Sequence, residues 1–150
     1  MIFNRLMLAA LFLLAANLQA MAEIRIGNNH GGLIQPYEQW AGAVAATGEN
    51  VVISGPCDSA CTLILGAVPR NRICVRPGGS LRFHAAFLGE KNEITQQIKF
   101  EGPSAAGTRE LWRNYPAYVR PWIKSHGGLT RKLIVLEGRE LERMFHRCPT

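Results

Sequence analysis

The sequence has 150 residues, of which 47% are hydrophobic and 19% charged, and its formal net charge is +6. The length is sufficient for one domain with a substantial core. The positive charges are scattered, with no run of like charge and no aromatic–basic motif, which argues against nucleic acid as a partner. They predict a solvated basic surface, and attraction to an anionic lipid or glycan stays open.

The first 22 residues are predicted to be a cleaved signal peptide. Arg5 provides a short basic start, residues 6–18 form an uncharged apolar run, and residues 20–22 are a small-x-small cleavage site. The apolar run is too short to span a bilayer comfortably, and an uncleaved membrane anchor is the alternative. The pattern therefore predicts a mature domain of residues 23–150 that is periplasmic or secreted.

The first half of the mature domain alternates short strands with helices. Strands are expected at residues 24–26, 51–53, 73–75 and 81–83, and helices at residues 37–45 and 60–68. The first helix has one apolar face, whereas the second is apolar throughout and should be buried on all sides. This order predicts an α/β fold with a mostly parallel sheet of short strands flanked by helices.

The pattern weakens after His84. Residues 90–107 are polar and are expected to form a loop or a surface helix. Helical spacing returns at residues 108–115 and 118–123, where Pro121 should kink or shorten the second segment. A strand at 133–136 and a short helix at 140–145 complete the expected elements.

Four cysteines remain after the predicted cleavage: Cys57, Cys61, Cys74 and Cys148. An even number in an exported chain favours two disulfides. Cys57 and Cys74 end two strands that are expected to be neighbours, which favours Cys57–Cys74 with Cys61–Cys148 among the three possible pairings. The gap between Cys57 and Cys61 fits neither zinc-ligand spacing nor a redox Cys-x-x-Cys, so we expect no metal and no cofactor.

Ser59 is the candidate nucleophile, because it lies where a short strand gives way to an apolar helix. His84 follows 25 residues later, beyond two more strands, and is the candidate general base. The backbone N–H of Ala60, with that of Gly31 or Gly32, could stabilise an oxyanion. The alternatives are a helix-capping role for Ser59, a core position for His84 and a simple turn at the glycine pair.

The order and spacing of three segments resemble the Clp protease proteolytic subunit, a family of the ClpP/crotonase superfamily. The segments are residues 28–34 (Asn-Asn-His-Gly-Gly-Leu-Ile), residues 55–61 (Gly-Pro-Cys-Asp-Ser-Ala-Cys), and residues 72–77 with His84. The resemblance covers residues 24–87. The chain also looks like a small exported branch of this superfamily that carries Gly-Pro-Cys-x-Ser-Ala-Cys-Thr.

The resemblance implies a single, reduced ClpP/crotonase-like domain. By that resemblance Ser59 is the nucleophile and His84 the general base, and the N–H groups of Gly31 and Ala60 form the oxyanion hole. The family's subunit rings and partner ATPase are not carried over, because the part of the chain after His84 matches poorly.

The third member of the family's catalytic triad, an aspartate well after the histidine, is missing. Asp58 is the only aspartate in the chain and it adjoins the nucleophile. Asn114 lies roughly where that aspartate is expected and could orient the ring of His84, and Glu110 is the other candidate. Ordinary surface polarity is the alternative for both.

Two hypotheses follow for the function. The first is an exported serine hydrolase that acts on an unidentified peptide or acyl substrate. The second is a non-catalytic, disulfide-braced binding or interaction module that keeps the fold. The incomplete triad favours the second, whereas the presence of Ser59, His84 and the glycine loop favours the first.

Overall fold

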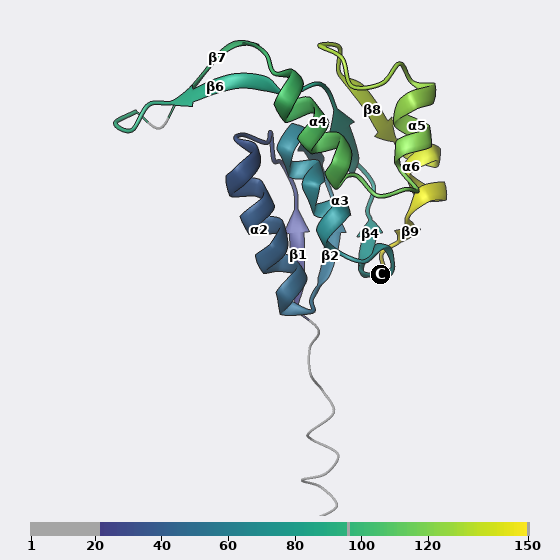
Figure 1. Cartoon of the computed structure of the whole chain (residues 1–150). Helices are drawn as coiled ribbons and strands as arrows, with labels where there is room; N and C mark the ends of the chain where they lie inside the picture. The colour runs from purple at the N-terminus through teal and green to yellow at the C-terminus, as the bar shows by residue number, and fades with distance from the viewer. Residues whose placement is uncertain (1–21, 96, 150) are drawn as a thin grey trace, which may run out of the picture.

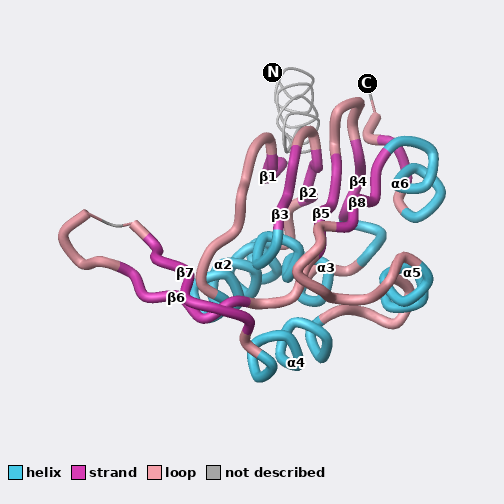
Figure 2. Tube along the Cα trace, turned by 90° about the horizontal axis from the view of Figure 1, so that it is seen from above, coloured by secondary structure: helices cyan, strands magenta, loops and turns pink. Residues whose placement is uncertain are grey.

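A computed structural model of the chain describes residues 22–95 and 97–149, so the predicted signal peptide lies outside the described residues except for its last position. This part of the chain is mixed α/β, as the alternation of strands and helices predicts. Two sheets carry helices on one side, and a long hairpin extends away from them (Figures 1 and 2). None of the helices in the described ranges is long and apolar enough to cross a membrane.

The larger sheet has four parallel strands in the order β1-β2-β4-β9. They are β1 (Glu23–Ile26), β2 (Asn50–Ile53), β4 (Ile73–Val75) and β9 (His146–Arg147). The first three confirm the predicted strands, and their inward side chains, such as Ile26, Ile53 and Val75, are buried. Among the four strands of this sheet, only β9, which has two residues, has no counterpart among the predicted elements.

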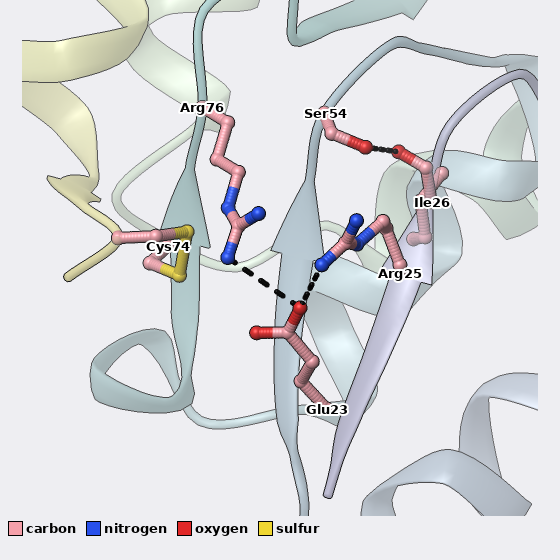
Figure 3. A network of polar contacts seen from close by, with 7 residues as sticks. Glu23, Arg25, Ile26, Ser54, Cys74 and Arg76 are labelled. Carbon is pink, nitrogen blue, oxygen red and sulfur yellow. Dashed lines mark hydrogen bonds and ion pairs between the residues drawn. A yellow bond between two sulfur atoms is a disulfide. The ribbon is translucent and has the colours of Figure 1, made fainter. Parts of the chain in front are cut away.

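The outer face of this sheet carries a polar network and a disulfide (Figure 3). The register places Arg25, Val52 and Cys74 in one row across three strands. The Glu23 carboxylate accepts a hydrogen bond from Arg25 and lies 3.5 Å from Nη2 of Arg76. Val52 is 1% exposed although it lies in this outer row, which indicates that the network and the disulfide shield it from solvent.

Three helices lie on the opposite face (Figure 2). They are α2 (Ile34–Thr47), α3 (Ile64–Ala67) and α4 (Ala105–Asn114), and a 3₁₀ helix, η1 (Ser59–Leu63), leads directly into α3. Their apolar side chains, including Val44, Ile64 and Leu111, join the strands in one core. The apolar segment at residues 60–68 is almost entirely buried, as its composition predicts.

The second sheet has the order β3-β5-β8 and begins where the chain bends sharply after β2. It contains β3 (Pro56–Asp58), β5 (Ser80–Phe83) and β8 (Ile134–Glu137). β3 and β5 are parallel, and β8 is antiparallel to β5. A Cβ atom on Gly55 would lie 1.5 Å from the Gly27 carbonyl oxygen, so only glycine lets the chain pass from β2 into β3.

The structure has two disulfides, but the pairing favoured from the sequence is wrong. The bonds are Cys57–Cys61 and Cys74–Cys148. Cys57 and Cys74 lie in different sheets, because the bend at Gly55 removes β3 from the sheet that contains β4. β9 runs beside β4 and brings Cys148 to Cys74.

The expectation of a loop or surface helix at residues 90–107 is also wrong. β6 (Phe87–Lys91) and β7 (Ile98–Pro103) form an antiparallel hairpin that projects from the body (Figure 1). The side chain of Asn92 closes its turn by accepting hydrogen bonds from the N–H groups of Ile94 and Thr95. The alternation of apolar and charged residues over 98–101 is the period-two signal of this strand.

The remaining elements are short. They are η2 (Arg70–Arg72), α5 (Arg120–Ser125) and α6 (Gly138–Met144). Pro121 lies in the first turn of α5, where its missing N–H costs no intrahelical hydrogen bond, so it begins a short helix and does not kink a longer one. η2 leads directly into β4, whereas α5 and α6 lie beside β8 (Figure 1).

The disulfide pairing can be checked by mass spectrometry of the unreduced protein after trypsin digestion. We expect Cys57 and Cys61 to be bonded within one peptide, residues 26–70, and Cys74 in peptide 73–82 to be linked to Cys148 in peptide 148–150. Any bond that links peptide 26–70 to another peptide would contradict the separation of the two sheets.

Candidate functional site

Ser59 has an unusual backbone conformation for a residue with a side chain. It directly follows β3 and has a φ of 55°, the only positive φ of a non-glycine residue in the described chain. This left-handed conformation costs about 1–2 kcal/mol and therefore needs support from its surroundings. Neither Ser59 nor Asp58 caps the 3₁₀ helix with its side chain, so the capping alternative is wrong. The Ser59 hydroxyl makes no hydrogen bond to another described residue.

Two neighbours hold this conformation in place. The Cys57–Cys61 disulfide closes a short loop around residues 58–60, and both sulfur-bearing residues are fully buried. Gly31, with a φ of 74°, packs against the same peptide units. A Cβ atom at this glycine would lie 2.4 Å from the Asp58 carbonyl oxygen and 2.9 Å from Cβ of Ser59, so no larger residue fits there.

A buried chain of hydrogen bonds fixes the peptide between Ser59 and Ala60. The Ser59 carbonyl oxygen can only accept, so Oγ1 of Thr62 donates to it at 2.5 Å. The Tyr115 hydroxyl, 2.8 Å away, must then donate to Oγ1 of Thr62. Burial raises the pKa of Tyr115 to about 12, partly offset by its bond to Thr62, so this donor stays protonated at ordinary pH. Holding the carbonyl on one side directs the Ala60 N–H to the other side.

The structure changes the expected set of oxyanion donors. The Gly31 N–H donates to Oδ1 of Asn29 at 3.0 Å, and the Tyr37 hydroxyl donates to the same oxygen at 2.5 Å. Gly31 therefore shapes the site but does not offer its amide. The Gly32 N–H makes no hydrogen bond to another described residue, and Ala60 lies in the first turn of η1, where backbone amides have no partner within the helix.

His84 lies just beyond the end of β5 and is half-buried. Its Nδ1 is 2.6 Å from the Ala85 carbonyl oxygen. Because a carbonyl cannot donate, Nδ1 carries a proton, and in the neutral imidazole Nε2 then has a lone pair that can accept one. The imidazole also contacts the ring of Phe87, with centroids 5.5 Å apart. A backbone oxygen and an aromatic ring thus orient this side chain.

Ser59 and His84 line the same cavity, which has a volume of about 820 Å³. No hydrogen bond joins these two described residues, so they share the cavity without being bonded to each other. The β6–β7 hairpin, α4 and the glycine loop supply the remaining walls. The apolar lining residues are Leu33, Ile34, Ala86, Phe87, Leu88, Ile98, Phe100 and Leu111. No Asp, Glu, Lys or Arg is found among the described lining residues, which favours an uncharged, apolar ligand group.

The structure does not bring Asn114 to His84. Nδ2 of Asn114 donates to the Glu38 carboxylate at 2.7 Å and to the Glu110 carbonyl oxygen at 3.1 Å, at the far end of α4. Neither Asn114 nor Glu110 lines the cavity. The orienting position at Nδ1 of His84 is instead occupied by the carbonyl of Ala85, because the backbone turns directly after β5.

His30 is a second histidine of the cavity wall that sequence reasoning missed. Its Nδ1 is 2.9 Å from Oδ2 of Asp58, and Oδ1 of that carboxylate lies 3.6 Å from Nε of Arg82. The three side chains form a row because Asn29 pairs with Cys57, and Asp58 pairs with Arg82 across β3 and β5. His30 and Asp58 are 28 residues apart in the sequence, so their proximity becomes apparent only from the strand pairing.

No protein-family model matches the chain, and neither a curated protein nor a solved structure gives a significant match. Among the described residues there is also no group of three or more His, Cys, Asp or Glu side chains that could hold a metal ion. The chemistry of the site must therefore be inferred from its own residues.

Replacing Thr62 tests the hydrogen-bond chain beneath Ser59. We expect Thr62→Val to lower the free energy of unfolding by about 1–3 kcal/mol, because it leaves the buried Tyr115 hydroxyl without a partner. Adding Tyr115→Phe removes that orphaned group and should restore part of the loss, as chemical denaturation would measure. Thr47→Val, which removes a similar hydroxyl at the end of α2, is the matched control. Additive effects of Thr62→Val and Tyr115→Phe would contradict the proposed coupling.

Proposed function

We propose that this protein is a serine hydrolase of peptide or acyl bonds, with Ser59 as its nucleophile. The observation that carries the proposal is the positive φ of Ser59, whose unbonded hydroxyl shares a cavity with His84. Strained conformations that surrounding structure over-determines are typical of functional sites. Here a disulfide, a glycine and a buried hydrogen-bond chain all support one residue that has no evident structural need for them.

The reaction would proceed through an acyl-enzyme. Oγ of Ser59 attacks the substrate carbonyl carbon, and its proton passes to Nε2 of His84. The N–H groups of Ala60 and Gly32 stabilise the negative charge that develops on the carbonyl oxygen. His84 returns the proton to the leaving group as the scissile bond breaks. Water then attacks the acyl carbon while Nε2 of His84 takes its proton, and His84 returns that proton to Oγ of Ser59 as the C–Oγ bond breaks and the acid is released. No cofactor takes part in this scheme.

The absence of a hydrogen bond between the described side chains of Ser59 and His84 fits an enzyme without bound substrate, because catalytic hydrogen bonds often tighten only when substrate is present. The Ala85 carbonyl holds the tautomer that a base needs. It would stabilise the imidazolium less than a carboxylate does. We therefore expect slow turnover relative to enzymes with a complete Ser-His-Asp set.

The walls of the cavity indicate the kind of group that Ser59 would act on. Aliphatic and aromatic side chains from the hairpin and α4 surround the hydroxyl, and the described walls carry no fixed charge other than what the histidines gain on protonation. An apolar acyl chain or an apolar side chain next to the scissile bond would fit such a lining. Ionised groups would lose their hydration there without gaining a partner.

We further propose a reduced ClpP/crotonase-like fold for this chain. In support, the glycine loop, Ser59 and His84 each follow a strand and meet at one cavity, in the order that the resemblance implies. The two disulfides are compatible with an oxidising compartment and support export, with residues 1–22 as the proposed signal peptide. The proposal includes no partner ATPase.

The second candidate function is a non-catalytic binding module. One observation favours it: the only aspartate, Asp58, is engaged by His30 and Arg82 and is not available to His84. In that case the same apolar cavity would bind its ligand without turnover.

A fluorophosphonate probe separates the two functions. The probe forms an Oγ–P bond with an activated serine and expels fluoride. We expect labelling of Ser59 that disappears in Ser59→Ala and slows by about 10²–10⁴-fold in His84→Gln, the usual contribution of a general base. Ser54→Ala, which removes a nearby serine bonded to the Ile26 carbonyl, is the matched control and should label normally.

The same probe tests the support beneath the nucleophile. Thr62→Val with Tyr115→Phe should label more slowly even where stability is restored, because the Ala60 amide loses its fixed direction. Absence of labelling between about pH 6 and 9, with both disulfides intact, would reject the hydrolase in favour of the binding module. Loss of labelling in His30→Gln but not in His84→Gln would reject His84 as the base.

A further inference from the structure

The net positive charge of residues 22–149 comes from one stretch of the chain. Residues 105–133, which include α4, α5 and the loop before β8, carry six basic side chains and a single acidic one, Glu110. The rest of residues 22–149 carries ten basic and ten acidic side chains and is therefore balanced. The six basic residues are Arg109, Arg113, Arg120, Lys124, Arg131 and Lys132; we call their surface the basic face.

The basic face has no acidic partners of its own. Every described ion pair of the protein belongs to other residues, and none involves a member of the basic face. Five of its six side chains are exposed, and Arg120 is half-buried. Nε of Arg120 is buried with no hydrogen-bond partner. Unpaired like charges in one area repel one another, and an anionic ligand would relieve that repulsion.

Trp112 neighbours four of the six residues of the basic face: Arg109, Arg113, Arg120 and Lys124. The guanidinium carbon of Arg120 is 5.7 Å and Nζ of Lys124 is 5.5 Å from the centre of its ring, so both cations interact with the indole. Beside the indole lies a hollow of about 430 Å³. Its walls are Thr108, Arg109, Trp112, Arg113 and Leu129. Arg109 and Arg113 are four residues apart and therefore flank the hollow from one side of α4.

This hollow is separate from the cavity of Ser59, and α4 divides them. Gly107 and Leu111 of α4 line the catalytic cavity, whereas Arg109, Trp112 and Arg113 line the hollow. No residue lines both. A ligand in the hollow would thus bind independently of any reaction at Ser59.

We propose that the basic face binds an acidic polysaccharide, a chain of sugars that bear carboxylates. Carboxylates along such a chain match the paired donors of arginine side chains, and one sugar would occupy the hollow beside Trp112. A lipid surface is a poorer fit, because Leu133 is the only strongly exposed large apolar residue within residues 105–133 and Trp112 is half-buried. Single-stranded nucleic acid is also a poorer fit, since it needs exposed aromatic rings for stacking.

Fluorescence titration tests the proposal with an oligogalacturonate of defined length as the probe. The protein, purified from an oxidising compartment, should show a change in tryptophan emission at low salt that weakens as salt is added. Arg109→Gln with Arg113→Gln should weaken binding at least about tenfold, a loss of about 1.4 kcal/mol. Trp112→Phe should abolish most of the emission change, because Trp40 and Trp122 lie outside the hollow.

The matched control is Arg139→Gln with Arg143→Gln on α6, which removes the same charge at the same helical spacing. We expect it to change the affinity by less than about twofold, a small effect on the scale of binding free energies. Equal losses in the two double variants would show attraction to net charge alone and would overturn the proposal. Absence of binding at low salt would also overturn it. So would tighter binding to single-stranded DNA of equal charge, or to vesicles containing an anionic phospholipid, than to the oligogalacturonate.

Discussion

The candidate site depends on one peptide unit, the link between Ser59 and Ala60, held in a conformation that a serine does not favour. A left-handed φ turns the hydroxyl out of the helix start and toward the cavity, at a cost of about 1–2 kcal/mol. The Thr62–Tyr115 hydrogen-bond chain holds its carbonyl, Gly31 packs against it, and the Cys57–Cys61 bond closes the loop around it. Without these three supports, the serine would relax into an ordinary helix start and the cavity would lose its polar centre.

The architecture around this peptide explains why remote segments meet there. The bend at Gly55 separates the chain into two sheets, and β3 and β5 then run in parallel, which brings the ends of both strands to one side. Ser59 follows β3 and His84 follows β5, so the parallel pairing itself brings the two side chains into one cavity. Helix α4 closes this cavity with its apolar face and turns its basic face outward. One helix therefore contributes to two chemically different surfaces.

Local patterns in the sequence were sufficient for the helices and for strands β1, β2, β4, β5 and β8, but not for the short strands β3 and β9 or for the β6–β7 hairpin. They failed where long-range pairing decides the outcome. The cysteine pairing depends on which sheet β3 joins. The bend at Gly55 that decides this could not be recognised from the sequence. The row formed by His30, Asp58 and Arg82 could be predicted only from the register of three chain segments. Thr62 is different, because a lone polar residue in an apolar helix could have been recognised as a buried hydrogen-bonding group.

The most direct measurement is a crystal structure of the protein after reaction with a fluorophosphonate. Our account predicts phosphorus bonded to Oγ of Ser59, a positive φ retained at that residue, and the phosphoryl oxygen within about 2.7–3.1 Å of the Ala60 N–H. His84 should then lie beside the adduct, with Nδ1 still bonded to the Ala85 carbonyl. A Ser59 that remains unmodified, with a helical φ and its hydroxyl bonded to the backbone of its own helix, would contradict the account.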